Sequence, residues 1–140
     1  MTTEQLTEWP VTAPREVGTL PLARLRRVTD YIREHLDQDL TLAQLGAVVY
    51  MSRFHFARLF QRSTGLPPHR FVVGRRIGRA KELLETENVS IASVAQAVGF
   101  RTPSHFTTVF RRSMGVTPSA YRAARGLHVP LRDTADASSR

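Results

Sequence analysis

The chain of 140 residues has room for one domain, or for two very small subdomains that share an element. Its formal net charge is +8, and it contains no cysteine, which excludes disulfides, thiol catalysis and thiolate metal sites. An apolar content of 41% allows a packed core, but there is no run that could cross a bilayer and no signal-peptide pattern. We therefore expect a cytoplasmic protein that has no membrane partner.

The N-terminal part predicts a leader and one helix. Residues 1–19 carry prolines and a glycine without an apolar period, so we expect a flexible leader there. Apolar residues then recur at helical spacing, which predicts an amphipathic helix from about Pro21 to His35. Its expected buried face consists of Leu22, Leu25, Val28, Ile32 and Leu36.

The next elements are a short helix, a tight turn and a longer helix. Thr41 can cap a helix from Leu42 to Val48, a turn follows at Tyr50 and Met51, and Ser52 caps the longer helix. Gly65 can end that helix in the left-handed conformation. The expected buried residues are Leu42, Leu45 and Val49 in the short helix, and Phe56, Leu59 and Phe60 in the longer one.

A long helix is predicted from about Pro68 to Thr86, because proline is tolerated in the first turn and apolar residues follow at helical spacing. It would be about 25 to 30 Å long at 1.5 Å per residue. The expected apolar positions are Phe71, Ile77, Ala80, Leu83 and Leu84.

A second short helix, turn and longer helix follow. Ser90 and Thr102 are the predicted caps, with Pro103 at the first helical position, and Gly115 ends the longer helix. Thr117 and Pro118 begin a last short helix, and residues 126–140 read as a disordered tail. The expected buried residues are Ile91, Val94, Ala95, Val98, Phe106, Val109 and Phe110.

The segments 52–65 and 102–115 are near copies with a fixed offset. No alternating strand pattern is present, so the predicted fold is all-α with about seven helices. Each copy is a helix-turn-helix. We predict one such subdomain at 20–67 and another at 88–125, joined by a linker helix at 68–87.

Charge is distributed unevenly along the chain. No Asp or Glu lies from Leu40 to Lys81 or from Asn88 to Arg132, and Arg supplies all but one of the basic residues there. A cationic segment without acids indicates a polyanion partner. The preference for Arg suits phosphate and guanine contacts, but a GC-rich genome would explain it equally well.

The outward faces of the longer helices are the candidate DNA readers, because the second helix of a helix-turn-helix enters the major groove with its N-terminus first. Arg58 can pair with guanine, and Phe54 can pack on a thymine methyl, unless Phe54 instead packs under the turn. The short side chains of the second copy predict weaker base discrimination. The candidate base readers are Arg53, Phe54, Ala57, Arg58, Gln61, Pro103, Ser104, His105, Thr107 and Thr108. The candidate phosphate contacts are Arg62, Arg75, Arg101, Arg111 and Arg112.

No catalytic or metal-binding set stands out. His55 and His105 occupy the same position in the two copies, and without a partner at metal-ligand spacing they favour packing or phosphate contact. Hydroxyls and arginines alone do not make a nucleophile, base and orienting acid. We therefore expect no enzyme activity, no metal and no cofactor.

The ordered combination of motifs is specific. It comprises Ser52–Phe60; Gly65, Pro68 and Phe71; Arg76, Arg79, Ala80, Leu83 and Leu84; Ile91, Ala92, Val94, Ala95 and Val98–Phe100; and His105, Phe106, Val109, Phe110, Gly115, Pro118 and Tyr121. From about Leu22 to Arg122, this pattern resembles the AraC/XylS family of bacterial transcription regulators. The resemblance implies seven helices, two helix-turn-helix units and base reading by the N-terminal residues of both longer helices.

Three positions depart from the family pattern. Many members have Gly where Tyr50 stands and Ala where Gly46 stands, so the first turn is expected to differ in shape or tightness. Thr108 stands where some members place Arg, which again predicts a weaker second reader. Most members also carry an effector domain for which this chain is too short, so it resembles the standalone branch or a fragment.

The predicted function is a sequence-specific regulator of transcription, acting as an activator on double-stranded promoter DNA. Helices at about 52–63 and 102–113 would enter successive major grooves about 34 Å apart, so a monomer could read an asymmetric site. RNA polymerase is a further partner implied by the family, and the protein would associate with the nucleoid. The alternatives are a non-specific nucleic-acid-binding protein and a basic protein-interaction module.

Overall fold

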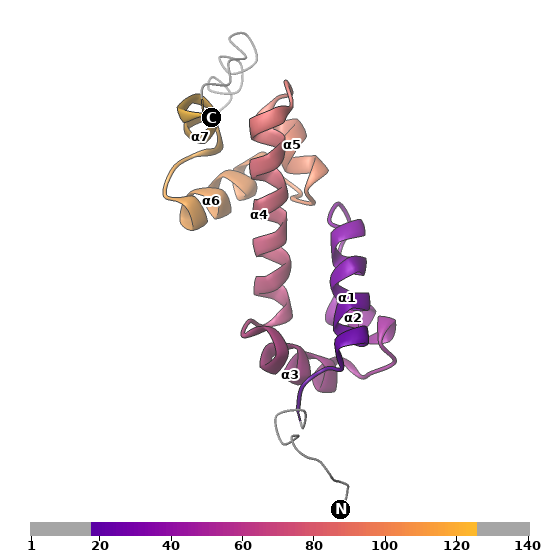
Figure 1. Cartoon of the computed structure of the whole chain (residues 1–140). Coiled ribbons are helices and arrows are strands. Elements are labelled where there is room, and N and C mark those ends of the chain that lie inside the picture. Colours follow the sequence, from indigo (N-terminus) through magenta and orange to yellow (C-terminus); the bar gives the residue numbers. More distant parts are fainter. Residues whose placement is uncertain (1–17, 126–140) are drawn as a thin grey trace, which may run out of the picture. The chain divides into compact units, whose positions relative to one another are not determined.

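The computed structural model describes residues 18–125, and all regular structure in that range is helical (Figure 1). The seven helices are α1 (Leu22–Glu34), α2 (Leu42–Val48), α3 (Arg53–Thr64), α4 (Pro68–Thr86), α5 (Ile91–Ala97), α6 (Pro103–Met114) and α7 (Pro118–Ala124). The all-α prediction and the predicted order of helices are confirmed. The predicted tail, and the predicted leader except for Gly18 and Thr19, lie outside the described residues.

The chain divides into two compact units. The first unit contains the described residues up to His35 together with Leu40–Val72, and the second contains Leu36–Asp39 and the described residues from Val73 onward. The long helix α4 therefore contributes its first residues to one core and the rest to the other. The segment Leu36–Asp39, which we predicted in the first subdomain, packs with the second unit.

The core of the first unit lies between α1, α2 and α3. Val28 and Ile32 of α1, Leu45 of α2, and Phe56 and Phe60 of α3 are fully or almost fully buried. The Phe60 ring also meets Phe71 of α4 edge to face, with ring centroids 5.0 Å apart. The predicted inward stripe of α3 is thus confirmed.

Two leucines predicted in this core are exposed instead. Leu22 is 62% exposed and Leu42 is 37% exposed. Each is the first residue of its helix, α1 and α2 respectively. Helical spacing shows which face a residue occupies, but not whether a neighbouring helix extends far enough to cover that end.

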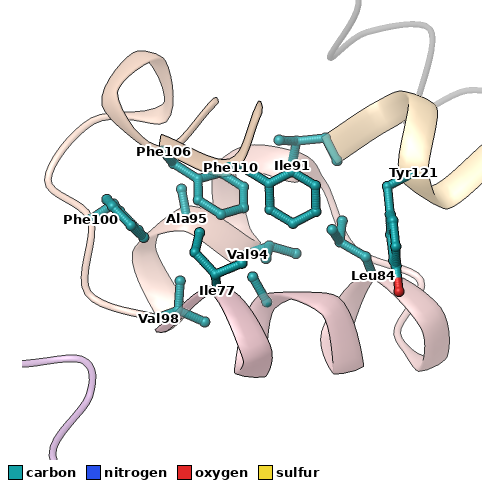
Figure 2. Close-up of a cluster of buried hydrophobic side chains, with 11 residues drawn as sticks. Ile77, Leu84, Ile91, Val94, Ala95, Val98, Phe100, Phe106, Phe110 and Tyr121 are labelled. Carbon is teal, nitrogen blue, oxygen red and sulfur yellow. The ribbon is translucent and has the colours of Figure 1, made fainter. Parts of the chain in front are cut away.

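The core of the second unit gathers side chains from α4, α5, α6 and α7, as Figure 2 shows. Rings run through it in sequence: Phe100 to Phe106 at 5.3 Å, Phe106 to Phe110 at 5.6 Å, and Phe110 to Tyr121 at 5.6 Å between centroids. Val109, predicted to point inward, is only partly buried at the edge of this cluster.

One buried side chain in the second unit is charged. Arg122 of α7 is fully buried, and its Nε and Nη2 donate to the carbonyls of Leu84 and Glu87 at 3.4 and 3.5 Å. These carbonyls lie at the C-terminal end of α4, where the helix dipole favours a cation. Arg122 belongs to the cationic segment of the sequence, but its side chain is buried and bonds to the end of α4 instead of reaching the surface.

The predicted caps are present at both longer helices. Ser52 Oγ accepts from the His55 N–H at 3.2 Å, and Thr102 Oγ1 accepts from the His105 N–H at 3.1 Å. Each helix ends at a left-handed glycine, Gly65 or Gly115. The repeated residues therefore build the same helix twice.

The two turns that precede these helices differ. Helix α5 begins 49 residues after α2, whereas α6 begins 50 residues after α3, so the second turn is one residue longer. The backbone bond that closes each turn is nevertheless the same, from Met51 N–H to Gly46 carbonyl and from Phe100 N–H to Ala95 carbonyl, both at 2.9 Å. The first turn is thus differently shaped, as expected, but it is not loosened.

Gly46 is required by the shorter turn. A Cβ at this position would lie 2.7 Å from the Met51 carbonyl oxygen, which belongs to the backbone and cannot rotate away. Ala95 holds the corresponding place in the second unit, where the additional residue leaves room for a methyl group. Gly46 is therefore a consequence of turn length.

Candidate nucleic-acid interface

Helix α3 presents its predicted reading face to the surface. Arg53, Phe54, Arg58 and Gln61 are exposed, and Ala57 is half-buried. Phe54 is 73% exposed, so the alternative in which it packs under the turn is wrong. An apolar ring that remains in water beside a well-packed core is available to an apolar group on a partner.

Arg53 and Phe54 lie against each other at the start of α3. The Arg53 guanidinium carbon is 4.9 Å from the centroid of the Phe54 ring. A cation–π contact of this kind is worth about 0.5–1 kcal/mol at an exposed site, and it limits the positions available to both side chains. The two candidate readers therefore contact each other at the start of α3.

A groove of about 600 Å³ runs beside the reading face of α3. It is lined by Leu42, Phe54, Ala57, Arg58, Gln61, Arg62, Pro67, Pro68 and His69. Arginines and apolar groups face this groove, and no carboxylate does. Sequence reasoning missed Leu42, Pro67 and His69 as surface groups of this site, because only the packing of α2, α3 and α4 brings them beside the recognition face.

Helix α6 presents a smaller and more polar face. Pro103, Ser104, His105 and Thr108 are exposed, and Thr107 is half-buried. The His105 ring meets Phe100 edge to face, with centroids 5.4 Å apart, so it rests on the core edge of the second unit. Its counterpart His55 is exposed at the start of α3.

All five candidate phosphate contacts are at the surface. These residues are Arg62, Arg75, Arg101, Arg111 and Arg112. Arg101 also donates to Asp39 at 3.0 Å, in a pair whose side chains are 82% and 71% exposed. Solvent screens such a pair strongly, so a phosphate could replace Asp39 at little cost.

Arg76 differs from these surface arginines. Its Nη2 donates to the Gln38 carbonyl at 2.7 Å, while its Nε is buried and has no hydrogen-bond partner among the described residues. Burial lowers the pKa of Arg76, and the nearby Asp39 carboxylate partly opposes that effect. Arg76 therefore holds the Leu36–Asp39 segment in place, a role that the sequence did not indicate.

Residues 18–125 contain neither a membrane-spanning helix nor a cluster of metal ligands. No helix in this range is long and apolar enough to span a membrane. No group of three His, Cys, Asp or Glu side chains in the same range could hold a metal ion.

Comparison with known proteins shows what these helices belong to. A family model described as "Helix-turn-helix domain" matches residues 45–124, which is more than half of the chain. The structure resembles that of a transcriptional regulator with an AraC-type DNA-binding domain from Chromobacterium violaceum, at 27% identity and a TM-score of 0.70, covering 74% of this chain and 93% of that one. This chain belongs to the AraC/XylS family.

Several transcription regulators are also similar. The crystal structure of the DNA-binding domain of AdpA in complex with a target DNA matches at 40% identity and a TM-score of 0.69, covering 72% of this chain and 91% of that one. The MmsAB operon regulatory protein of Pseudomonas aeruginosa is 37% identical over 117 residues, which is 84% of this chain and 37% of that regulator.

Regulatory protein PocR of Salmonella typhimurium is 38% identical over 100 residues, which is 71% of this chain and 33% of that protein. The chain thus spans about a third of the length of these curated relatives. What it shares with them is the AraC-type helix-turn-helix DNA-binding domain of a transcription regulator.

Proposed function

We propose that this AraC-type domain binds double-stranded promoter DNA with sequence specificity, placing α3 and α6 in successive major grooves. One observation carries the proposal. The two helices share their caps and their terminal glycines, yet they expose different side chains at the N-terminal positions that would meet base edges. The AdpA domain, which has the same fold, was solved with a target DNA, and this supports duplex DNA as the ligand.

The roles of individual side chains follow from their chemistry. Arg58 and Arg53 can donate two hydrogen bonds to guanine, Phe54 can cover a thymine methyl, and Gln61 can pair with adenine. The hydroxyls of Ser104 and Thr107 can form hydrogen bonds with several bases. The DNA segment that α6 contacts should therefore vary more in sequence than the segment that α3 contacts. The surface arginines bind phosphates and so fix the position of the protein along the duplex.

The site should be asymmetric and bound by one chain. The two reading faces belong to one polypeptide and differ in sequence, so a palindrome would offer the wrong half-site to one of them. We further propose that the regulator acts in the cytoplasm on the nucleoid and activates transcription through contact with RNA polymerase. In vitro transcription from a template carrying the selected site, with and without the protein, tests that activating role.

The DNA proposal is tested by selecting bound duplexes from a random library. Fluorescence anisotropy then compares a selected duplex with a scrambled one over a series of salt concentrations. We expect two unequal boxes about 10 bp apart and affinity for the scrambled duplex lower by at least about 1,000-fold. If all five candidate phosphate contacts form, log K should fall with log salt at a slope of about −4 to −5.

Equal affinity for selected and scrambled duplexes would overturn the proposal. A preference for single-stranded DNA or RNA in competition would do the same, and it would favour the non-specific alternative. Sedimentation of the complex measures stoichiometry, for which we expect one chain per site.

A further inference from the structure

Tyr50 is the most exposed of the exposed large apolar or aromatic side chains among the described residues, at 82%, and its backbone has φ of 61°. It is the only residue other than glycine with positive φ in the described range. Side chains are disfavoured in this left-handed region because the Cβ crowds the following carbonyl. A bulky aromatic residue there needs an explanation.

The second turn holds glycine at the corresponding position. There the left-handed position is held by Gly99, with φ of 96°, where a Cβ would in addition clash with the Leu36 carbonyl oxygen. Because the Tyr50 ring is exposed, it gains little from packing on the described residues. The left-handed backbone of Tyr50 therefore costs stability that its exposed ring does not recover by burial, and this points to a use on a partner.

The position of Tyr50 indicates which part of the partner it would meet. It stands two residues before Ser52, which caps α3, the helix proposed to enter the major groove with its N-terminus first. In such a motif the first helix crosses the DNA backbone, so the turn between the two helices is expected near the phosphates, which tyrosine hydroxyls can contact. No acid lies in the sequence from Leu40 to Lys81, but Asp30 and Glu34 of α1 line a groove together with Val48 of α2, which is two residues before Tyr50.

We propose that Tyr50 is a DNA-positioning residue whose hydroxyl donates a hydrogen bond to a phosphate oxygen beside the groove that α3 enters. The phenol is a neutral donor, so it orients α3 without displacing a counterion. This inference rests on the proposed function and adds a contact that holds the first recognition helix in register.

The direct test is Tyr50→Phe, which removes only the hydroxyl. We expect affinity for the selected duplex to fall about 5- to 10-fold with an unchanged salt slope, because no charge is lost. Tyr31→Phe is the matched control, since Tyr31 lies on α1 and its ring stacks on His35. That variant should bind like the wild type.

Duplexes with single methylphosphonate substitutions locate the phosphate. One substitution should weaken the wild type about 5- to 10-fold and leave Tyr50→Phe unaffected, since the bond is already absent in that variant. The inference is overturned if Tyr50→Phe binds like the wild type, or if every methylphosphonate weakens both proteins equally.

Tyr50→Gly distinguishes the effect of Tyr50 on folding stability from its effect on DNA binding. We expect its melting temperature to rise by about 2–6 °C while its affinity falls at least as far as that of Tyr50→Phe. A lower melting temperature would overturn the inference, because the ring would then be retained for folding. Failure of the proposed function looks different: the wild type itself would then bind selected and scrambled duplexes alike.

Discussion

The two helix-turn-helix units use the same frame to present different surfaces. The reading face of the first unit exposes two arginines, a phenylalanine and a glutamine on α3, whereas that of the second exposes a proline, a serine, a histidine and a threonine on α6. Ser52 and Thr102 cap these helices in the same way, and Gly65 and Gly115 end them with φ of 85° and 83°. Folding and recognition are therefore carried by different positions of one repeated segment, so the reading face can change without altering the helix.

The comparison also shows where the units are not interchangeable. The first turn is shorter, and it combines Gly46 with a strained Tyr50, while the second combines Ala95 with an unstrained Gly99. Val72 and Arg122 are equivalent positions of the repeat, because each directly follows the repeated aromatic residue, Phe71 or Tyr121. The first is an apolar core residue and the second is a buried cation.

The largest expected effect tests the shared frame. Phe60→Ala and Phe110→Ala should each destabilise their own unit by about 3–5 kcal/mol, because both rings are completely buried. Urea unfolding followed by circular dichroism measures the loss. A loss well below this range for one variant alone would show that the repeated phenylalanines are not equivalent in packing.

Replacing Arg122 probes the asymmetry between the two cores. Arg122→Ala should cost about 2–3 kcal/mol, since it removes buried packing and leaves the carbonyls of Leu84 and Glu87 without these donors. Val72→Ala is the matched variant and should cost less, because only methyl groups are lost. The same unfolding measurement applies, and an equal cost for both would contradict a special role for the cation.

Exchanging the small residues at equivalent positions, Gly46 and Ala95, tests how much room each turn leaves for a methyl group. Gly46→Ala should destabilise the first unit by about 1–3 kcal/mol, because the new methyl group meets the Met51 carbonyl. Ala95→Gly should cost about 1 kcal/mol through helix propensity alone. Thermal unfolding distinguishes them, and a stabilising Gly46→Ala would show that the first turn can widen.

The last prediction concerns the inequality of the two reading faces. Arg58→Ala should weaken binding of the selected duplex by about 1–3 kcal/mol and relax one base position, whereas Thr108→Ala should cost under about 1 kcal/mol. Arg112→Ala serves as the phosphate control and should weaken all duplexes alike, reducing the salt slope by about 1. Identical behaviour of the Arg58 and Arg112 variants would remove the distinction between readers and positioners.

Much of the fold could be predicted because its signals are local. Caps at Ser52, Ser90 and Thr102, and a helix-ending glycine at Gly65, depend on neighbours within a few residues, and all of them appear in the structure. The inward stripes follow from helical spacing in the same way. The predicted burial of Leu22 and Leu42 was wrong, because burial there depends on how far another helix extends.

The candidate site could be predicted only in part. The outward positions of α3 follow from its buried stripe, so the exposure of Phe54 and Arg58 was foreseeable. The groove shared with Pro67 and His69 was not, because it forms where α4 begins beside α3. Sequence also could not distinguish a surface arginine such as Arg112 from a buried one such as Arg122.

By itself, the sequence determined the helices, their ends, the repeated frame and the family, since each of these depends on short-range hydrogen bonds, spacing and ordered motifs. Tertiary structure decided which charges remain at the surface, which glycines lack room for a methyl group, and which aromatic residue is held in a strained turn. The physical reason is that burial and crowding are set by atoms distant in the chain. The burial of Arg122 and the strained, exposed position of Tyr50 could therefore be recognised only from the tertiary structure.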